Sequence, residues 1–314
     1  MKKMNIVFCG TPDFAVPTLE LLHQHPYVNI VAVVTMPDRP AGRGQGLKSP
    51  PIAEYAKLHK LPLYQVENIN REEKILEEFS TKKIDFFLVL AFAQFLGSKI
   101  LNMPKIGCFN IHTSILPKYR GAAPIQYALL NGDSSTGVSI QKMVKEMDAG
   151  DLVHFHELAI AKYETGGQLY TRLKFQSALS TNTLLDNILN NKLTSTKQDI
   201  NKVSFAPTLK KEDGFLNFRE STIIKIENKI KALDPWPGTY CFINNQRLKI
   251  FEIEKLHRNL LPGETSIEHG HLAVGVLDGV VRLSSIQIEG KKICTDTEFL
   301  NGLKNKDGPI LLNP

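Results

Sequence analysis

The first 112 residues alternate between short runs that are hydrophobic at almost every position and longer stretches with hydrophobic residues at helical spacing. Strands buried on both faces read as continuous apolar runs, whereas a surface helix keeps one apolar stripe. The sequence therefore predicts a Rossmann-like α/β domain with a mostly parallel sheet covered by helices on both faces. The predicted strands are 5–9, 30–34, 61–64, 86–91 and 106–112, with helices near 14–22, 51–58 and 72–79.

The pattern changes after residue 148, where a strand at 153–160 and one long helix at 166–189 are predicted. A polar stretch without apolar periodicity follows, which is typical of a linker. A helix at 223–233 and short strands separated by turn residues then predict a small OB-like β-barrel, with strands at 240–243, 248–253, 272–276 and 280–288. The predicted organisation is a first domain at 1–189, a linker at 190–206 and a second domain at 207–314.

Composition and charge narrow the class of protein. The 314 residues are 42% hydrophobic and carry a net charge of +6, which favours an anionic partner. Residues 205–314 hold 15 Lys and Arg against 14 Asp and Glu, so a nucleic-acid surface there must be a local patch. Four scattered cysteines indicate reduced thiols. No apolar run reaches the roughly 18 residues of a membrane span, and no export signal is recognised, so a cytoplasmic protein is expected.

The strongest candidate chemistry lies at the end of the strand predicted at 106–112. Asn110 and His112 are two positions apart, so their side chains project from the same face of the strand. Ligands of parallel sheets sit beyond the carboxyl ends of the strands, where this pair lies. An amide donor beside an imidazole suits a developing oxyanion and a proton transfer, and Asp148 supplies a carboxylate further along. Alone, His112 would be an ordinary core histidine and Asp148 a turn residue before Ala149.

Two other motifs carry weaker signals. The glycines of the stretch 42–46 lack the Lys-Ser/Thr of a phosphate-binding loop, so a flexible basic lid is favoured over a nucleotide site. His154 and His156 share one strand face but lack an obvious third metal ligand. No metal is therefore expected.

The motif Ser114-Ile115-Leu116-Pro117-Lys118-Tyr119-Arg120-Gly121, preceded by Asn110 and His112, resembles the signature of the 10-formyltetrahydrofolate-dependent formyltransferases. The sequences at 8–15, 37–44 and 234–238 extend the resemblance to nearly the whole chain, and they resemble the branch whose acceptor is methionyl initiator tRNA. The resemblance implies formyl transfer for translation initiation, with Asn110, His112 and Asp148 as the catalytic residues. Ile115, Ala93 and Gly97 depart from the family pattern, where leucine, glycine and proline stand.

The resemblance also implies the binding residues and partners. The co-substrate would be 10-formyltetrahydrofolate, bound by Phe92, Ala93, Phe95, Leu96, Ser114, Leu116 and Pro117. The tRNA would contact Arg39, Arg43, Lys48, Lys210, Lys211, Arg247, Lys249, Lys291 and Lys292. Nothing in the sequence demands an oligomer, so a monomer is expected.

Two other functions compete with this interpretation. A formyltransferase for an amino-sugar nucleotide would use the same three catalytic residues, but it would not need the basic loop at 39–48. A non-catalytic RNA-binding protein on the same fold would have no use for Asn110, His112 and Asp148 together. The intact set and the loop therefore favour the tRNA-directed enzyme.

Overall fold

The computed structural model describes residues 3–41, 46–244, 246–302 and 312–313. The chain forms two compact units. The first consists of Met1–Pro124, Ser135–Ala159 and Tyr170–Ala206, and the second of Ile125–Ser134, Ile160–Leu169 and Pro207–Pro314.

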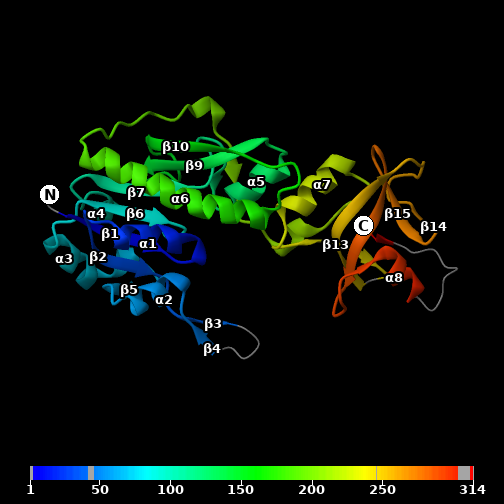
Figure 1. The fold of residues 1–314 in the computed structure, drawn as a ribbon, viewed down its shortest axis with the longest axis horizontal. Coiled ribbons are helices and arrows are strands. Elements are labelled where there is room, and N and C mark those ends of the chain that lie inside the picture. The colour runs from blue at the N-terminus through cyan, green and yellow to red at the C-terminus, as the bar shows by residue number, and fades with distance from the viewer. Residues whose placement is uncertain (1–2, 42–45, 245, 303–311, 314) are drawn as a thin grey trace. The chain divides into compact units, whose positions relative to one another are not determined.

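A seven-stranded sheet organises the first unit (Figure 1). Its order is β10 (Leu152–Ala159), β9 (Ser135–Lys142), β7 (Gly107–His112), β6 (Phe86–Leu90), β1 (Met4–Gly10), β2 (Val28–Thr35) and β5 (Leu63–Gln65). Strands β7, β6, β1, β2 and β5 are mutually parallel. Near one edge, β9 pairs in antiparallel register with β7 and with β10, so β9 alone runs in the opposite direction. The chain winds outward from β1 in both directions, so the mostly parallel α/β sheet predicted from the sequence is confirmed.

Both faces of this sheet are buried, as the continuous apolar strands predict. On one face, Val7 and Phe87 pack with Leu76 and Phe79 of α3 (Glu73–Thr81). On the other, α1 (Val16–Gln24) packs against β2 and α2 (Pro51–Leu58), and α6 (Gly166–Leu189) runs along the same side (Figure 1). The ring of Tyr170 in α6 lies 4.8 Å from that of Phe14 just before α1.

Strand β9 is the main element of the first unit that the hydrophobic pattern does not predict. It lies between β7 and β10 and pairs with both in antiparallel register. Gly137 permits this close pairing, because a Cβ atom there would lie 2.1 Å from the carbonyl oxygen of His156. The strand mixes Ser, Thr, Gly and Gln with Val138 and Ile140, so its apolar signal is short.

Segment 190–206, predicted as a linker, packs within the first unit. Thr196 forms a bridge with Leu152, and β11 (Phe205–Ala206) pairs in parallel with β8 (Arg120–Gly121). The carbonyl oxygen of Ser204 accepts a hydrogen bond from the Arg120 amide, and its hydroxyl oxygen accepts one from the Tyr119 amide. The predicted domain boundaries stay a prediction, but this segment has fixed partners.

The second unit contains an antiparallel sheet with α7 (Ile223–Ala232) packed against it. Its order is β14 (Thr265–Glu268), β15 (His271–Val276), β16 (Gly279–Ile288), β13 (Gln246–Leu256), β12 (Thr239–Ile243) and β18 (Leu312–Asn313), and β17 (Cys294–Thr295) pairs with β16. Its core includes Ile226 of α7 with Leu248, Val274 and Leu283 from three strands. The predicted fold class, an α/β domain followed by a small OB-like β-domain, is confirmed.

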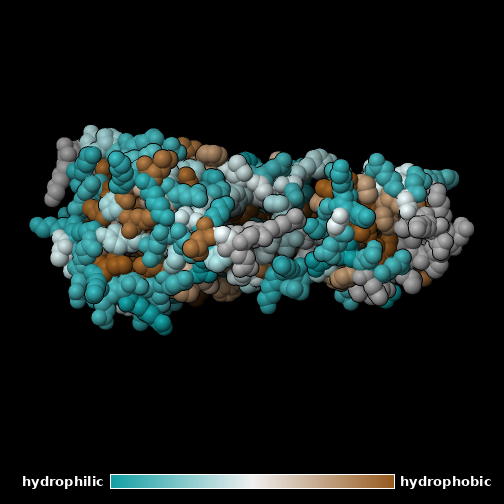
Figure 2. All heavy atoms as spheres, turned by 90° about the horizontal axis from the view of Figure 1, so that it is seen from below, coloured by the Kyte–Doolittle hydropathy of each residue, from teal (hydrophilic) through white to brown (hydrophobic). Residues whose placement is uncertain are grey.

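The surface and the thiols complete the description. Figure 2 shows one face of the molecule, on which hydrophilic residues predominate and hydrophobic ones lie in between. Within the described residues, no helix combines the length and apolar character needed to cross a bilayer. Cys9, Cys108 and Cys241 are buried free thiols, and burial raises the pKa of Cys108 and of Cys241 to about 12.

Candidate functional site

Asn110 and His112 lie in the last three residues of β7, at the carboxyl edge of the parallel sheet. The backbone of Asn110 pairs with Val89 of β6 and with Gln141 of β9, so neighbours on both sides fix this end of the strand. The intervening Ile111 is buried in the sheet, which directs the two polar side chains to the same face. His112 is also buried, with 6% of its side chain exposed.

Asp148 reaches the same place from a turn after β9. Its backbone adopts φ of 51°, in the left-handed region that few non-glycine residues occupy. Its Oδ1 accepts hydrogen bonds from Nδ2 of Asn110 at 3.3 Å and Nε2 of Gln141 at 2.8 Å. Its Oδ2 accepts one from the Gly121 amide at 2.9 Å and lies 3.7 Å from Nδ1 of His112. The structure thus brings Asn110, His112 and Asp148 together.

The surroundings of His112 determine which of its ring nitrogens can exchange a proton. Nε2 lies 2.8 Å from the carbonyl oxygen of Tyr119. A carbonyl oxygen only accepts, so Nε2 must carry the proton of that bond. Nδ1, which faces Asp148, is therefore the position that gains or loses a proton. Asn110 adds an amide that carries a second N–H beside the one bonded to Asp148.

Two glutamines hold the Asp148 turn and were not predicted from the sequence. Gln141 donates to Asp148 Oδ1, and its Oε1 accepts from the Gly150 amide at 3.0 Å. Gln198 donates to the carbonyl oxygens of Asp148 and Gly150 at 2.9 and 2.7 Å. Recognising β9 as the partner of β7 would have placed Gln141 opposite Asn110. Gln198 lies in a polar stretch without periodicity, which gives no signal.

Loop 91–97, which contains four of the predicted folate contacts, leaves β6 beside β7. Phe92 and Leu96 are buried, whereas Ala93 is exposed and Phe95 is 66% exposed. Asn70 donates to the Phe95 carbonyl oxygen at 2.8 Å and accepts from the Gly97 amide at 2.6 Å. Ala93 keeps φ of 59°, although the family pattern has glycine there. The backbone shape typical of glycine is thus retained with a methyl side chain.

The other three predicted folate contacts lie in the turn after β7. Ser114 is fully buried, and its hydroxyl donates to the Lys118 carbonyl oxygen at 2.6 Å. The amide of Leu116 donates to the hydroxyl of Ser139 at 3.1 Å, and Leu116 is buried too. Pro117 is half-buried. Ser114 and Leu116 therefore shape the turn, and Pro117 is its more accessible member.

Two of the three basic residues predicted in the first unit lie on the antiparallel pair of β3 (Arg39–Ala41) and β4 (Gly46–Lys48). Arg39 and Lys48 are directly opposite each other in its register, and both are exposed. Nη2 of Arg39 also lies 2.7 Å from Oε2 of Glu67. The third predicted residue, Arg43, is outside the described residues.

In the second unit, the structure brings several predicted basic residues to one side of the sheet. Arg247 and Lys249 are two positions apart on β13, and the Arg247 guanidinium lies 3.8 Å from the ring centre of Tyr240. Lys249 is in register with Gln287, whose side chain donates to the Lys291 carbonyl oxygen at 2.7 Å. Lys210, Lys211, Lys249, Lys291 and Lys292 are exposed. Phe215, four residues after Lys211, packs against Tyr240 with the ring centres 5.8 Å apart.

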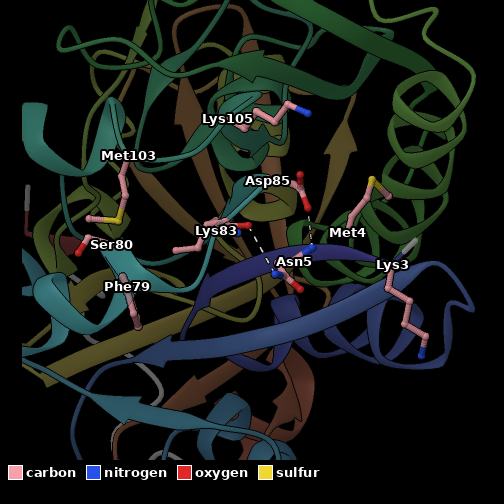
Figure 3. A pocket seen from close by; sticks show the side chains of 10 residues that line it. Lys3, Met4, Asn5, Phe79, Ser80, Lys83, Asp85, Met103 and Lys105 are labelled. Carbon is pink, nitrogen blue, oxygen red and sulfur yellow. Dashed lines mark hydrogen bonds between the residues drawn. The ribbon is translucent and has the colours of Figure 1, made fainter. Parts of the chain in front are cut away.

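A separate cavity of about 540 Å³ lies at the opposite edge of the parallel sheet (Figure 3). It surrounds Met4 and Asn5 at the start of β1 and Asp85 just before β6. Its central polar groups hold the strands together, since the Asn5 amide donates to Asp85 Oδ2 at 2.8 Å. No catalytic candidate lines it.

The described residues contain no group of three or more His, Cys, Asp or Glu side chains arranged to hold a metal ion. His154 and His156 lie on the edge strand β10. Burial, with the neighbouring His156, lowers the pKa of His154.

Known protein families match both parts of the chain. Residues 2–183 match the family described as "Formyl transferase", and residues 208–304 match "Formyl transferase, C-terminal domain". A methionyl-tRNA formyltransferase of Geobacter sulfurreducens is 36% identical over 312 residues, covering 99% of this chain and 98% of the relative. A methionyl-tRNA formyltransferase of Thermotoga maritima is 39% identical over 301 residues, covering 95% of each.

Solved structures share the fold at lower identity. The sugar 3N-formyl transferase WlaRD, determined with dTDP and 5-N-formyl-THF, superposes with a TM-score of 0.67 at 20% identity, covering 93% of this chain and 100% of the other. The N-formyltransferase of Helicobacter canadensis gives a TM-score of 0.65 at 21% identity, covering 90% and 99%.

Proposed function

This chain belongs to the formyl transferase family, and on that premise we propose that it transfers the formyl group of 10-formyltetrahydrofolate to the amino group of methionyl initiator tRNA. The convergence of Asn110, His112 and Asp148, in a chain similar along its whole length to methionyl-tRNA formyltransferases, carries this proposal. The reaction would supply formylated initiator tRNA for translation. The monomeric state and cytoplasmic location expected from the sequence stay part of the proposal.

Stabilising the formyl oxygen is the first task of these residues. When the amine attacks the formyl carbon, negative charge develops on that oxygen. Two donors from β7 face the site, the Asn110 amide and, when protonated, Nδ1 of His112. Because the strand ladders hold both, they need little reorganisation as charge develops. Loss of one such donor costs about 100- to 1000-fold in turnover.

The bonding of Asp148 favours an electrostatic role. A carboxylate offers about four lone-pair positions. Three accept N–H bonds from Asn110, Gln141 and Gly121, and the remaining side faces His112 Nδ1 at 3.7 Å. Asp148 would therefore stabilise the protonated imidazole and orient it. The proton leaving the amine would pass to Asp148, directly or through water, because the protonated imidazole cannot accept a second one. Collapse of the intermediate would break the bond between the formyl carbon and N10 of the folate, which would take up that proton and leave as tetrahydrofolate.

The folate group fits the loop at the end of β6. Exposed Phe95 offers an aromatic surface, and Ala93 offers backbone in a left-handed conformation beside it. Phe92, Leu96, Ser114 and Leu116 are buried and would shape the walls. Pro117 would contact the ligand from the turn after β7.

Binding of tRNA would use both basic groups. Arg39 and Lys48 lie side by side on the antiparallel pair of β3 and β4, and they and Arg43 would reach the acceptor end. Arg247, Lys249, Lys291 and Lys292, with Lys210 and Lys211, would bind phosphates on the second unit. Contacts of this kind give an affinity that falls steeply with salt.

The direct test is a reaction with charged initiator tRNA and 10-formyltetrahydrofolate, followed by chromatography of the released amino acid. A parallel reaction replaces the tRNA with an amino-sugar nucleotide, since the solved structures with this fold include sugar formyltransferases. We expect formylmethionine in the first reaction and no formyl sugar in the second. Formylation of the sugar alone would overturn the proposal.

A further inference from the structure

The side chain of Gln198 is fixed by hydrogen bonds on every side. Its Nε2 donates to the carbonyl oxygens of Asp148 and Gly150, at 2.9 and 2.7 Å. Its Oε1 accepts from Nε and Nη2 of Arg120, at 3.1 and 2.7 Å. Both amide protons and both lone pairs are therefore used. The amide orientation is unambiguous, because carbonyls only accept and a guanidinium only donates.

Gln198 also differs from its immediate neighbours in segment 190–206. Its neighbours Lys197 and Asp199 are exposed, whereas Gln198 is half-buried. A flexible connection would have no reason to bury one amide and bond it to the first unit four times. The contacts converge on the turn that presents Asp148.

That turn needs external support. Asp148 has φ of 51°, a backbone conformation that costs a non-glycine residue about 1–3 kcal/mol unless its surroundings impose it. Gln141 holds the turn from β9 through the Asp148 carboxylate and the Gly150 amide. Gln198 holds the same turn by donating to the backbone carbonyl oxygens of Asp148 and Gly150. Together the two amides fix the turn from both sides.

We propose that Gln198 is a positioning residue for the reaction, which holds the Asp148 turn so that its carboxylate faces Asn110 and His112. Gln198 is then the one residue of segment 190–206 that this proposal connects to the active site, and Arg120 orients its amide. The catalytic part of this inference rests on the proposed function, whereas the structural part does not. It follows that a change at residue 198 acts on turnover through Asp148, without contact to either substrate.

The substitution Gln198→Glu separates positioning from general support. The introduced carboxylate would keep an acceptor for Arg120, but it would lose both N–H donors and face the two carbonyl oxygens with negative charge. We expect kcat to fall about 10- to 100-fold, which is the effect of displacing a reacting group by about 1 Å. The KM for both substrates should change less than about threefold. The pH–rate profile should also change its midpoint, because Asp148 moves relative to the imidazole. Lys197→Ala, the exposed neighbour, should leave kcat and the profile unchanged.

Amide hydrogen exchange provides a readout that does not depend on the reaction. In Gln198→Glu, the peptide covering residues 148–152 should exchange at least about tenfold faster than in wild type, since its turn loses two bonds. Gln198→Ala serves the same purpose if the first variant fails to fold. Unchanged exchange, or kcat within about twofold of wild type, overturns the positioning role. Faster exchange in a protein that does not formylate tRNA would instead leave positioning intact and refute the proposed function.

Discussion

The Nε2 atom of His112 donates a hydrogen bond to the carbonyl oxygen of Tyr119 across 2.8 Å, within a buried part of the first unit. This bond ties the imidazole to the turn after β7 and leaves Nδ1 for Asp148. The bond also allows the structural role of His112 to be tested apart from its chemical role. The side-chain amide of glutamine can replace Nε2, whereas that of asparagine can replace only Nδ1.

His112→Gln keeps an amide near the position of Nε2, so the bond to Tyr119 is retained and the free energy of unfolding should change by less than about 1 kcal/mol. His112→Asn leaves the Tyr119 carbonyl oxygen without its donor and should cost about 1–3 kcal/mol. Both lose the titratable Nδ1, so turnover should fall at least about 100-fold in each. Urea unfolding and single-turnover formylation measure the two effects. A His112→Gln enzyme with near-normal turnover would show that no imidazole is needed.

Ala93 tests the strain in the loop after β6. With φ of 59°, its methyl group occupies a conformation that costs L-residues about 1–2 kcal/mol. Ala93→Gly relieves this cost but adds flexibility to the unfolded chain, worth about 0.5–1 kcal/mol, so a net gain of up to about 1 kcal/mol is expected. Ala93→Val should be destabilising because a β-branched residue tolerates this region poorly. If glycine lowered the free energy of unfolding, the left-handed conformation would be wrong.

Much of this architecture follows from the hydrophobic pattern. The strand ending at His112 and the helix 166–189 were predicted almost to the residue, because long apolar runs and long periodic stretches are unambiguous. Strand β9 is not predicted because Ser, Thr, Gly and Gln interrupt its apolar run. One of the residues that interrupts the apolar pattern is Gln141, and its side chain donates a hydrogen bond to Asp148.

The proximity of Asn110 and His112 could be predicted because these two positions share a strand face whatever the rest of the fold, whereas Asp148 was joined to them through the family resemblance. The support around these three residues could not be predicted. The bonds of Gln198 and the Tyr119 carbonyl join positions whose proximity depends on the complete fold. The left-handed backbone of Asp148 is likewise invisible in a sequence that has no glycine at that position.

Arg247 offers a test of the basic group on the second unit. Its guanidinium lies over the Tyr240 ring, with Cζ 3.8 Å from the ring centre. Arg247→Ala should weaken tRNA binding and lower the slope of log Kd against log salt by about 1, the signature of one lost phosphate contact. Filter binding between about 50 and 200 mM salt measures it. Lys225→Ala, an exposed lysine on α7, is the matched control, and an equal effect there would mean that charge alone, not this group, governs binding.

Asp296 links the stability of the second unit to pH. It is fully buried, and its carboxylate receives Nη2 and Nε of Arg282 at 2.8 and 2.9 Å and the Leu272 amide at 2.9 Å. Burial alone would raise the pKa of Asp296, but the hydrogen bonds from Arg282 and Leu272 outweigh it and hold the pKa below the ordinary 3.8. A carboxyl whose pKa is lowered by folding stabilises the native state above its ordinary pKa and loses that contribution as the pH falls.

Asp296→Asn should therefore cost about 3 kcal/mol at pH 7, since Arg282 loses its buried charged partner and keeps only Glu254, which is largely exposed. The difference between wild type and variant should shrink as the pH falls below about 4, because protonated Asp296 resembles asparagine. Urea unfolding from pH 7 to pH 3 measures this, and the single tryptophan, Trp236, reports on the second unit, where it lies. A difference that stayed constant over this range would mean that the Asp296 charge contributes nothing, and that shape alone makes the residue important.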